Sequence, residues 1–276
     1  MSNLVSTAWL ADHLNGVRVV DASWYMPDDH RAPAEEFEVA HIPGAVFFDI
    51  DGIADHSTDL PHMMPTPGEF SRAVGALGIS DLETVVVYDG TGLFSAPRAW
   101  WMLKAMGHRD VKVLDGGFPK WKREGRVIET GPARTGAKFF TAIPKPAIMR
   151  DFDAVMGIVK DKSAQMVDAR SASRFNAQEP EPRAGVRGGH MPGALNLPWR
   201  NVVADDGTLK PKDELRAAFT QVDLDQPIVT SCGSGISAAV LMLALDEIGA
   251  RDVALYDGSW TEWGGRPEAP VVSGQG

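Results

Sequence analysis

The strongest constraint on the fold is that the chain repeats itself. His-Ile-Pro-Gly-Ala at residues 41–45 recurs as His-Met-Pro-Gly-Ala at 190–194, an offset of 149 residues, and Val-Asp-Ala at 20–22 recurs at 167–169, an offset of 147. Asp-Gly followed by a tryptophan recurs at an offset of 142, at residues 115–121 and 257–263. Landmarks in the same order at nearly constant spacing indicate a duplicated architecture. We predict two homologous domains, residues 1–124 and 149–276, joined by a linker at 125–148.

Each half alternates short β-branched runs with helical patterns. Residues 17–21, 84–88 and 111–114 are typical of buried strands and have counterparts at 164–168, 227–231 and 253–256. Helical patterns cover residues 97–106 and 236–248, and Gly249 is a suitable C-terminal stop. This alternation predicts an α/β fold in which each domain is a parallel β-sheet flanked by helices. The linker has weak periodicity, three glycines and three prolines.

The charge and hydropathy of the chain argue against several classes of partner. Lys and Arg number 27 against 37 Asp and Glu, which gives a net charge of −10. Such a chain repels nucleic-acid phosphates and anionic membranes unless a local basic patch overrides the balance, and the sequence has none. It also lacks an apolar run of about 18 residues and an export signal near its first residue. We therefore expect a cytoplasmic protein without a nucleic-acid or membrane partner.

The single cysteine, Cys232, is the main candidate for chemistry. One cysteine can form neither an internal disulfide nor a cysteine-based zinc site. It begins the loop Cys-Gly-Ser-Gly-Ile-Ser at 232–237, between a predicted strand and a predicted helix, at the sheet edge where α/β proteins bind ligands. Inward-facing amides and a helix N-terminus favour an anion. We predict that the backbone of Gly233, Gly235, Ile236 and Ser237 stabilises a reactive thiolate.

Other interpretations of these motifs were weighed against this one. A buried, inert cysteine is a common alternative, but it needs no flexible polar loop after it. Cysteine phosphatases place an arginine six residues after the cysteine, and here that residue is Ala238. A dinucleotide fingerprint near residue 90 lacks its third glycine, and the acidic cluster at 49–55 lacks the spacing of a calcium loop. The sequence implies neither a metal nor a cofactor.

At this point the residues resemble a known family. The tandem repeat, His-Ile-Pro-Gly-Ala and the late run Tyr-Asp-Gly-Ser-Trp-Thr-Glu-Trp at 256–263 resemble the rhodanese-like sulfurtransferases over nearly the whole chain. The loop of Cys232 is similar to the branch that takes sulfur from 3-mercaptopyruvate, with Ser237 where threonine is more frequent. Thiosulfate-specific members instead have basic residues directly after the cysteine. The resemblance implies transfer of sulfane sulfur through a Cys232 persulfide to a thiol or cyanide, with release of pyruvate.

The resemblance also assigns roles to residues outside the loop. Arg174 and Arg183 match the family's substrate-binding segment, and guanidinium groups suit the carboxylate of mercaptopyruvate. The alternative is that these arginines are solvated and pair with Glu179 and Glu181.

Ser234, His62 and Asp51 match a proposed Ser-His-Asp relay that would move a proton to the departing enolate. Pro61 stands before this histidine, where the family more often has aspartate.

Two further expectations concern the first copy and the rival functions. In the first copy, Asp89 follows the strand in place of a cysteine, so we expect that copy to be non-catalytic. The acceptor is expected to be a small thiol, cyanide or a thioredoxin-like protein. One rival is a thiosulfate:cyanide sulfurtransferase (rhodanese) of the same fold, and the other is a non-enzymatic persulfide carrier.

Overall fold

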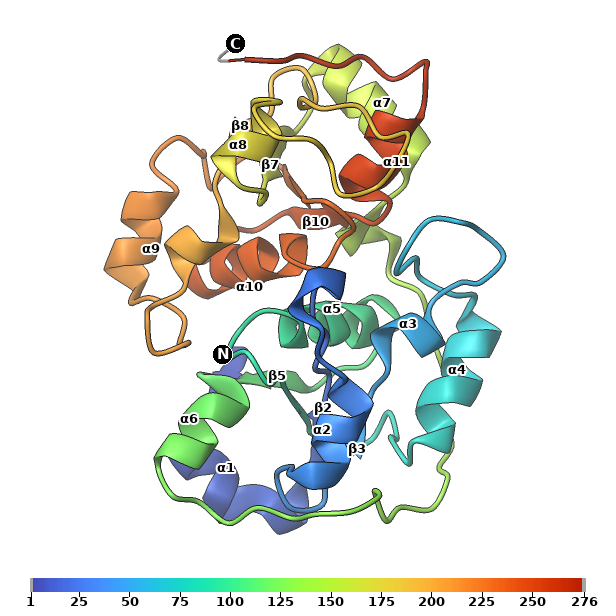
Figure 1. Ribbon diagram of the computed structural model, residues 1–276, viewed down its shortest axis with the longest axis vertical. Helices are drawn as coiled ribbons and strands as arrows, with labels where there is room; N and C mark the ends of the chain where they lie inside the picture. The colour runs from blue at the N-terminus through green and yellow to red at the C-terminus, as the bar shows by residue number, and fades with distance from the viewer. Residues whose placement is uncertain (1, 275–276) are drawn as a thin grey trace. The chain divides into compact units, whose positions relative to one another are not determined.

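The structure is a computed structural model that describes residues 2–274 (Figure 1). The chain divides into two compact units. Unit 1 comprises Met1–Asp55, Met64–Lys145 and Val203–Leu209, and unit 2 comprises His56–Met63, Pro146–Val202 and Lys210–Gly276. Each unit therefore includes a short segment from the other half of the sequence.

Unit 1 is built on five parallel strands in the order β1-β5-β4-β2-β3. The strands are β1 (Leu4–Val5), β2 (Arg18–Asp21), β3 (Val46–Phe47), β4 (Val85–Tyr88) and β5 (Val111–Leu114). Around them lie α1 (Thr7–His13), α2 (Pro33–Val39), α3 (Ile50–Ile53), α4 (Pro67–Ala76), α5 (Ala96–Ala105) and α6 (Gly117–Arg123). Helices α1, α2 and α6 contribute Leu10, Phe37 and Trp121 to one apolar core, and α5 packs on β4 and β5.

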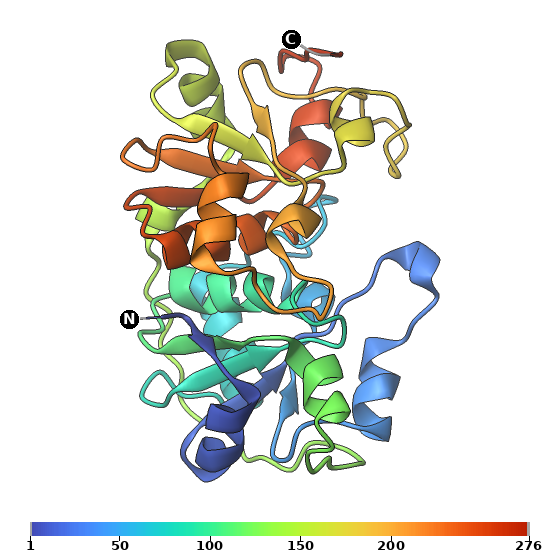
Figure 2. The same ribbon diagram turned by 90° about the vertical axis from the view of Figure 1, so that its left-hand side faces the viewer.

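Unit 2 repeats this plan with the strand order β6-β10-β9-β7-β8, again all parallel. Its strands are β6 (Met149–Arg150), β7 (Gln165–Asp168), β8 (Leu195–Asn196), β9 (Ile228–Ser231) and β10 (Val253–Tyr256). Its helices are α7 (Phe152–Asp161), α8 (Ala172–Phe175), α9 (Lys212–Ala218), α10 (Ala238–Ile248) and α11 (Ser259–Gly265). Figures 1 and 2 show α7 and α11 on one face of this sheet and α9 and α10 on the other. The predicted α/β fold is confirmed.

Most predicted elements agree with the structure to within one residue. The six inner strands start and end at or next to the predicted positions, and Gly249 ends α10 in the left-handed conformation with a φ of 93°. Helix α10 begins at Ala238, two residues later than predicted, because residues 236–237 form a turn. The edge strands β1, β3, β6 and β8 were not predicted, since each has only two residues and thus no periodicity.

The recurring His-x-Pro-Gly-Ala motif has a structural explanation. His41 stacks on Phe37 with ring centroids 4.0 Å apart, and its Nδ1 lies 2.7 Å from the Phe37 carbonyl oxygen. His190 stacks on Phe175 in the same way, at 3.8 Å, with Nδ1 2.9 Å from the Phe175 carbonyl oxygen. Each histidine thus fixes the end of the helix that precedes it.

The linker follows unit 1 closely. Lys138 donates its N–H to the Gly75 carbonyl, and Ile143 donates to that of Met106, both at 2.8 Å.

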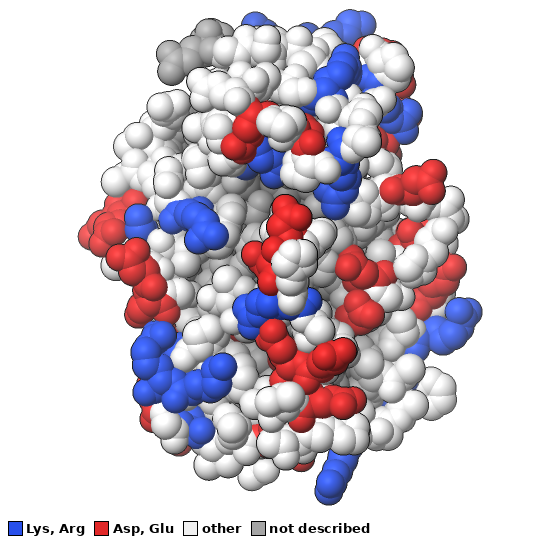
Figure 3. Space-filling view, in the orientation of Figure 1, with Lys and Arg blue, Asp and Glu red and all other residues white. Residues whose placement is uncertain are grey.

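Short 3-10 helices lie at Leu14–Gly16, Pro27–Asp29, Pro146–Ile148 and Trp199–Val202. Among residues 2–274, none of the helices has the length and hydropathy needed to cross a membrane. Figure 3 shows acidic and basic side chains interspersed on the face it displays.

Candidate functional site

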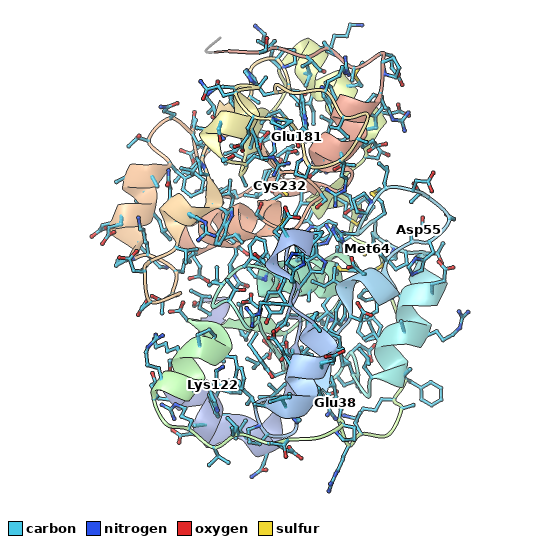
Figure 4. The ribbon with its side chains drawn as sticks, in the orientation of Figure 1. Glu38, Asp55, Met64, Lys122, Glu181 and Cys232 are labelled. Atoms are coloured by element: carbon cyan, nitrogen blue, oxygen red, sulfur yellow. The ribbon has the colours of Figure 1, made fainter. Side chains whose placement is uncertain are left out.

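The loop after β9 holds Cys232 in a network of backbone contacts. Gly235 donates its N–H to the Cys232 sulfur at 3.1 Å, and its φ of 84° lies in the region that favours glycine. The Cys232 N–H donates to the Ser259 hydroxyl at 3.2 Å, and its carbonyl accepts from Trp260 N–H at 2.9 Å. Cys232 is only 2% exposed, but it lies in a polar loop at the carboxyl edge of the sheet (Figure 4).

The start of α10 presents amides to the same loop. In the part of the chain that the structure describes, the N–H groups of Ile236, Ser237 and Ala238 donate to no protein acceptor. Such groups at a helix N-terminus carry the positive end of the helix dipole. The loop therefore has donors available for a further anionic atom beside the sulfur.

Arg174 lies directly against this loop. A Cβ added to Gly233 would lie 3.0 Å from Arg174 Nη2, so the guanidinium lies close to the backbone of this glycine. Ser171 caps α8, which carries Arg174, by accepting a hydrogen bond from the Arg174 N–H. The arginine side chain is 19% exposed, and Nη2 donates to Glu181 Oε2 at 2.5 Å.

Arg183 reaches the same glycine through a threonine. Its Nη1 lies 3.4 Å from the Thr261 hydroxyl oxygen, and Thr261 donates that hydroxyl to the Gly233 carbonyl at 2.7 Å. The Thr261 N–H donates to the same carbonyl at 2.9 Å. The two arginines predicted to bind substrate thus both lie beside the residue that follows Cys232. Arg174 also makes the alternative contact considered from the sequence, an ion pair with Glu181.

A second arginine stands behind Arg174. Arg170 is 2% exposed and donates to both oxygens of Asp168 and, through Nη1, to Glu181 Oε1 at 2.8 Å. Burial alone would lower the pKa of Arg170, but the charges of Asp168 and Glu181 outweigh it and raise the pKa. Its guanidinium lies 4.3 Å from the Trp260 ring centroid. Arg170 therefore ties the strand end of β7 to the edge of the cysteine loop.

The residues of the predicted relay fall in both units. Ser234 and His62 belong to unit 2 and are 8% and 5% exposed, and His62 has a left-handed φ of 62°. Asp51 belongs to unit 1, where its Oδ2 accepts from the Trp24 indole N–H at 2.9 Å. The relay therefore stays a prediction.

The equivalent loop of the first copy already holds an anion. Asp89 is fully buried, and its carbonyl accepts from Phe118 N–H at 3.0 Å, as that of Cys232 accepts from Trp260. Its carboxylate accepts five backbone N–H bonds of 2.8–2.9 Å. Oδ1 accepts from Thr91 and Gly92, and Oδ2 accepts from Phe94, Ser95 and Ala96. This loop and helix start can therefore enclose a negative charge.

Three residues near the site were given no functional role from the sequence, namely Ser259, Thr261 and Glu181. Ser259 has a φ of 49°, rare for a residue with a side chain, and its hydroxyl accepts the Cys232 N–H. The first copy has Gly117 at the equivalent position. The motif at 256–263 contains Ser259 and Thr261 and was the sequence signal that could have pointed to them.

Among the described residues, no group of three His, Cys, Asp or Glu side chains could hold a metal ion.

Comparison with known proteins places this geometry in a family. The profile of the rhodanese-like domain matches residues 6–124 and 152–266. The 3-mercaptopyruvate sulfurtransferase of Escherichia coli is 44% identical over 272 residues, covering 97% of this chain and 96% of the relative. The mitochondrial thiosulfate/3-mercaptopyruvate sulfurtransferase 1 of Arabidopsis thaliana is 43% identical over 295 residues, covering 98% of this chain and 78% of the relative.

The solved structures agree. The crystal structure of the 3-mercaptopyruvate sulfurtransferase SseA from Escherichia coli superposes with a TM-score of 0.87 at 42% identity, covering 94% of this chain and 99% of that one. The chain belongs to the rhodanese-like family and carries two copies of its domain. It is an enzyme, a sulfurtransferase that takes sulfur from a small-molecule donor and passes it to an acceptor. The non-enzymatic carrier is therefore excluded.

Proposed function

We propose that this enzyme takes sulfur from 3-mercaptopyruvate and releases pyruvate. The Cys232 thiolate attacks the donor sulfur, so that an S–S bond forms and the C3–S bond breaks. The electron pair of that bond leaves on C3 as the pyruvate enolate, which takes up the proton of the donor thiol. The products of this half-reaction are a Cys232 persulfide anion and pyruvate. An acceptor thiol or cyanide then removes the outer sulfur and restores the thiolate.

The observation that carries this proposal is the filled loop of the first copy. Asp89 Oδ1 accepts from Gly92 N–H, three residues on, as the Cys232 sulfur accepts from Gly235 N–H. Asp89 Oδ2 then accepts the three N–H groups at the start of α5, whose counterparts on α10 are those of Ile236, Ser237 and Ala238. In a Cys232 persulfide the outer sulfur is bonded to Sγ, two bonds from Cβ. Asp89 Oδ2 is likewise bonded to Cγ, two bonds from Cβ. These amides are suited to stabilise that sulfur.

The donor is assigned from the charges around the loop. Arg174 and Arg183 beside Gly233 offer planar donors for one carboxylate. The backbone of Gly233, Gly235, Ile236 and Ser237 completes the substrate site, and the loop itself carries no basic residue for a dianion. In this proposal Ser234, His62 and Asp51 relay the proton to the enolate.

Thiosulfate is the second candidate donor. The Arabidopsis thaliana relative supports this candidate, because its name includes thiosulfate as well as 3-mercaptopyruvate. The same loop chemistry applies, but the leaving group is sulfite and no pyruvate forms.

A donor assay on the purified chain distinguishes the two. With cyanide as acceptor, we expect mercaptopyruvate to give equal amounts of thiocyanate and pyruvate, with a kcat/KM at least about tenfold above that for thiosulfate. Thiosulfate turnover without comparable pyruvate formation would overturn the assignment. Arg174→Ala should lower kcat/KM for mercaptopyruvate about a hundredfold. Arg251→Ala, an exposed arginine at the opposite edge of the sheet before β10, is the matched control.

The wider setting is part of the same proposal. We assign the thiol chemistry to residues 149–276, keep 125–148 as the linker, and regard residues 1–124 as the non-catalytic copy because Asp89 replaces the cysteine there. We also propose a cytoplasmic location and a small-thiol or thioredoxin-like acceptor, and the acidic net charge argues against a nucleic acid as partner.

A further inference from the structure

Four alternating charges lead from the end of β7 to the cysteine loop. Asp168 pairs with Arg170 at 2.7 Å, Arg170 with Glu181 at 2.8 Å, and Glu181 with Arg174 at 2.5 Å. The side chains of Asp168, Arg170 and Glu181 are 1–3% exposed, and only Arg174 reaches solvent. The row ends where the Arg174 guanidinium lies 3.0 Å from the position that a Cβ of Gly233 would take. Figure 4 labels Glu181, which belongs to this row, and Cys232, which directly precedes Gly233.

Glu181 occupies one edge of the Arg174 guanidinium. Its Oε2 accepts from Nη2 and its Oε1 lies 3.4 Å from Nε, so that edge is committed to the carboxylate. Nη1 has no protein acceptor among the described residues and lies 3.5 Å from the position of a Gly233 Cβ. A donor at the loop thus meets one free nitrogen of a guanidinium whose charge is largely balanced.

Arg170 does not by itself account for the place of Glu181. Asp168 already accepts from Nε and Nη2 of Arg170, and the Gly189 carbonyl accepts from Nη2 at 2.8 Å. What Glu181 adds is the bridge to Arg174. Without the charge of Glu181, Asp168 would be the one carboxylate left in the row to balance Arg170 and Arg174. A net positive charge would then face the loop.

We propose that Glu181 is a positioning residue that sets the charge of the sulfur donor. It fixes the orientation of Arg174 and reduces the positive charge offered at the loop, so that a monoanionic donor is preferred to a dianionic one. The inference rests on the proposed use of mercaptopyruvate and explains how the same fold selects it over thiosulfate. The selectivity lies in a carboxylate behind the arginine as well as in the loop sequence.

The test is the ratio of kcat/KM for mercaptopyruvate to kcat/KM for thiosulfate. Glu181→Gln should lower this ratio about tenfold, mainly through a lower KM for thiosulfate, because one more unit of positive charge attracts a dianion more than a monoanion. Glu181→Asp keeps the charge and should leave the ratio within about twofold of wild type. Glu179→Gln removes a charge from an exposed neighbour bonded to Ser171 and should also leave the ratio unchanged.

A merely structural role predicts a different outcome. Both donors would then lose activity equally in Glu181→Gln, the ratio would not move, and the proposal would be wrong. A wild-type chain that does not use mercaptopyruvate would instead overturn the proposed function, whatever the variants do.

The wild-type chain gives a second readout if Glu181→Gln does not fold. Pyruvate and oxalate have nearly the same size and shape and differ by one negative charge. We expect pyruvate to inhibit competitively about tenfold more tightly than oxalate. Equal or stronger inhibition by oxalate would contradict a charge-limited site.

Discussion

The two copies of the strand-loop-helix unit hold different side chains in the same kind of cradle, which is the loop after the strand together with the N–H groups at the start of the next helix. After β4 the cradle holds the Asp89 carboxylate, which takes five N–H bonds, and after β9 it holds the Cys232 sulfur, which takes one from Gly235. The Asp89 carboxylate stays as it is, whereas the Cys232 sulfur can gain and lose a second sulfur atom. The comparison teaches that this fold supplies anion stabilisation, and that one side chain decides whether chemistry follows.

The two copies also differ in the side chain that lies against the glycine after Asp89 or Cys232. The Tyr25 hydroxyl lies over Gly90 where the Arg174 guanidinium lies over Gly233. Tyr25 donates to Glu36 at 2.9 Å, and Arg31 also pairs with Glu36. These residues line a cavity of about 510 Å³ at the carboxyl edge of the unit 1 sheet. A cavity at this edge of the sheet therefore does not require a thiol in the loop.

The largest effect is expected when the second cradle is made like the first. Cys232→Asp should reduce sulfur transfer at least a thousandfold, as should Cys232→Ser, because neither has a thiol. The aspartate variant should nevertheless be at least as stable as the serine variant, since its carboxylate can accept the amides at the start of α10. Equilibrium denaturation of both variants measures this. An aspartate variant that unfolds more readily than the serine variant would contradict the equivalence of the cradles.

Removing the charge in the first cradle should lower the stability of the chain. Asp89→Asn replaces one of the two carboxylate oxygens, which together accept five N–H bonds, by an NH2 group that cannot accept them. We expect the free energy of unfolding to fall by about 3–5 kcal/mol. Hydrogen exchange should rise most in residues 89–96, while the loop at 232–237 keeps its protection. Equal protection of residues 89–96 in variant and wild type would mean that the Asp89 bonds contribute little.

The aspartates at the ends of β2 and β7 should respond oppositely to loss of charge. Burial raises the pKa of Asp21 to about 6 from 3.8, although hydrogen bonds from Ser23 act to lower it. Because the folded state binds the Asp21 proton more tightly, the contribution of Asp21 to wild-type stability should fall as the pH rises from about 4 to 7, by about 3 kcal/mol. Asp21→Asn should remove this loss and stabilise the chain at pH 7.

Asp168→Asn is the matched change in unit 2. It should instead destabilise the chain by about 3–5 kcal/mol at pH 7, because it leaves Arg170 buried beside a neutral amide. Denaturation of both variants at pH 4.5 and 7 provides the measurement. Two variants with the same sign at pH 7 would refute the contrast between the strand ends.

Part of this account could be predicted from the sequence because it depends on periodicity and spacing. The repeat gave the two sheets, β-branched runs located the six inner strands, and the cysteine loop was recognisable from its glycines and its place after a strand. The edge strands carry no pattern in two residues. The site partners depend on tertiary contacts between distant segments, as when Ser259 accepts the Cys232 N–H or Glu181 bridges two arginines. The sequence showed that the first copy has Asp89 in place of a cysteine. It did not show that the Asp89 carboxylate accepts the N–H groups of the loop and the helix start.

The central claim is that the amides at the start of α10 hold the outer sulfur of the persulfide as those of α5 hold Asp89 Oδ2. A crystal structure of the wild-type chain after reaction with donor alone tests it most directly. The account predicts an outer sulfur within about 3.5 Å of at least two of the N–H groups of Ile236, Ser237 and Ala238. An outer sulfur that points away from all three amides would contradict it.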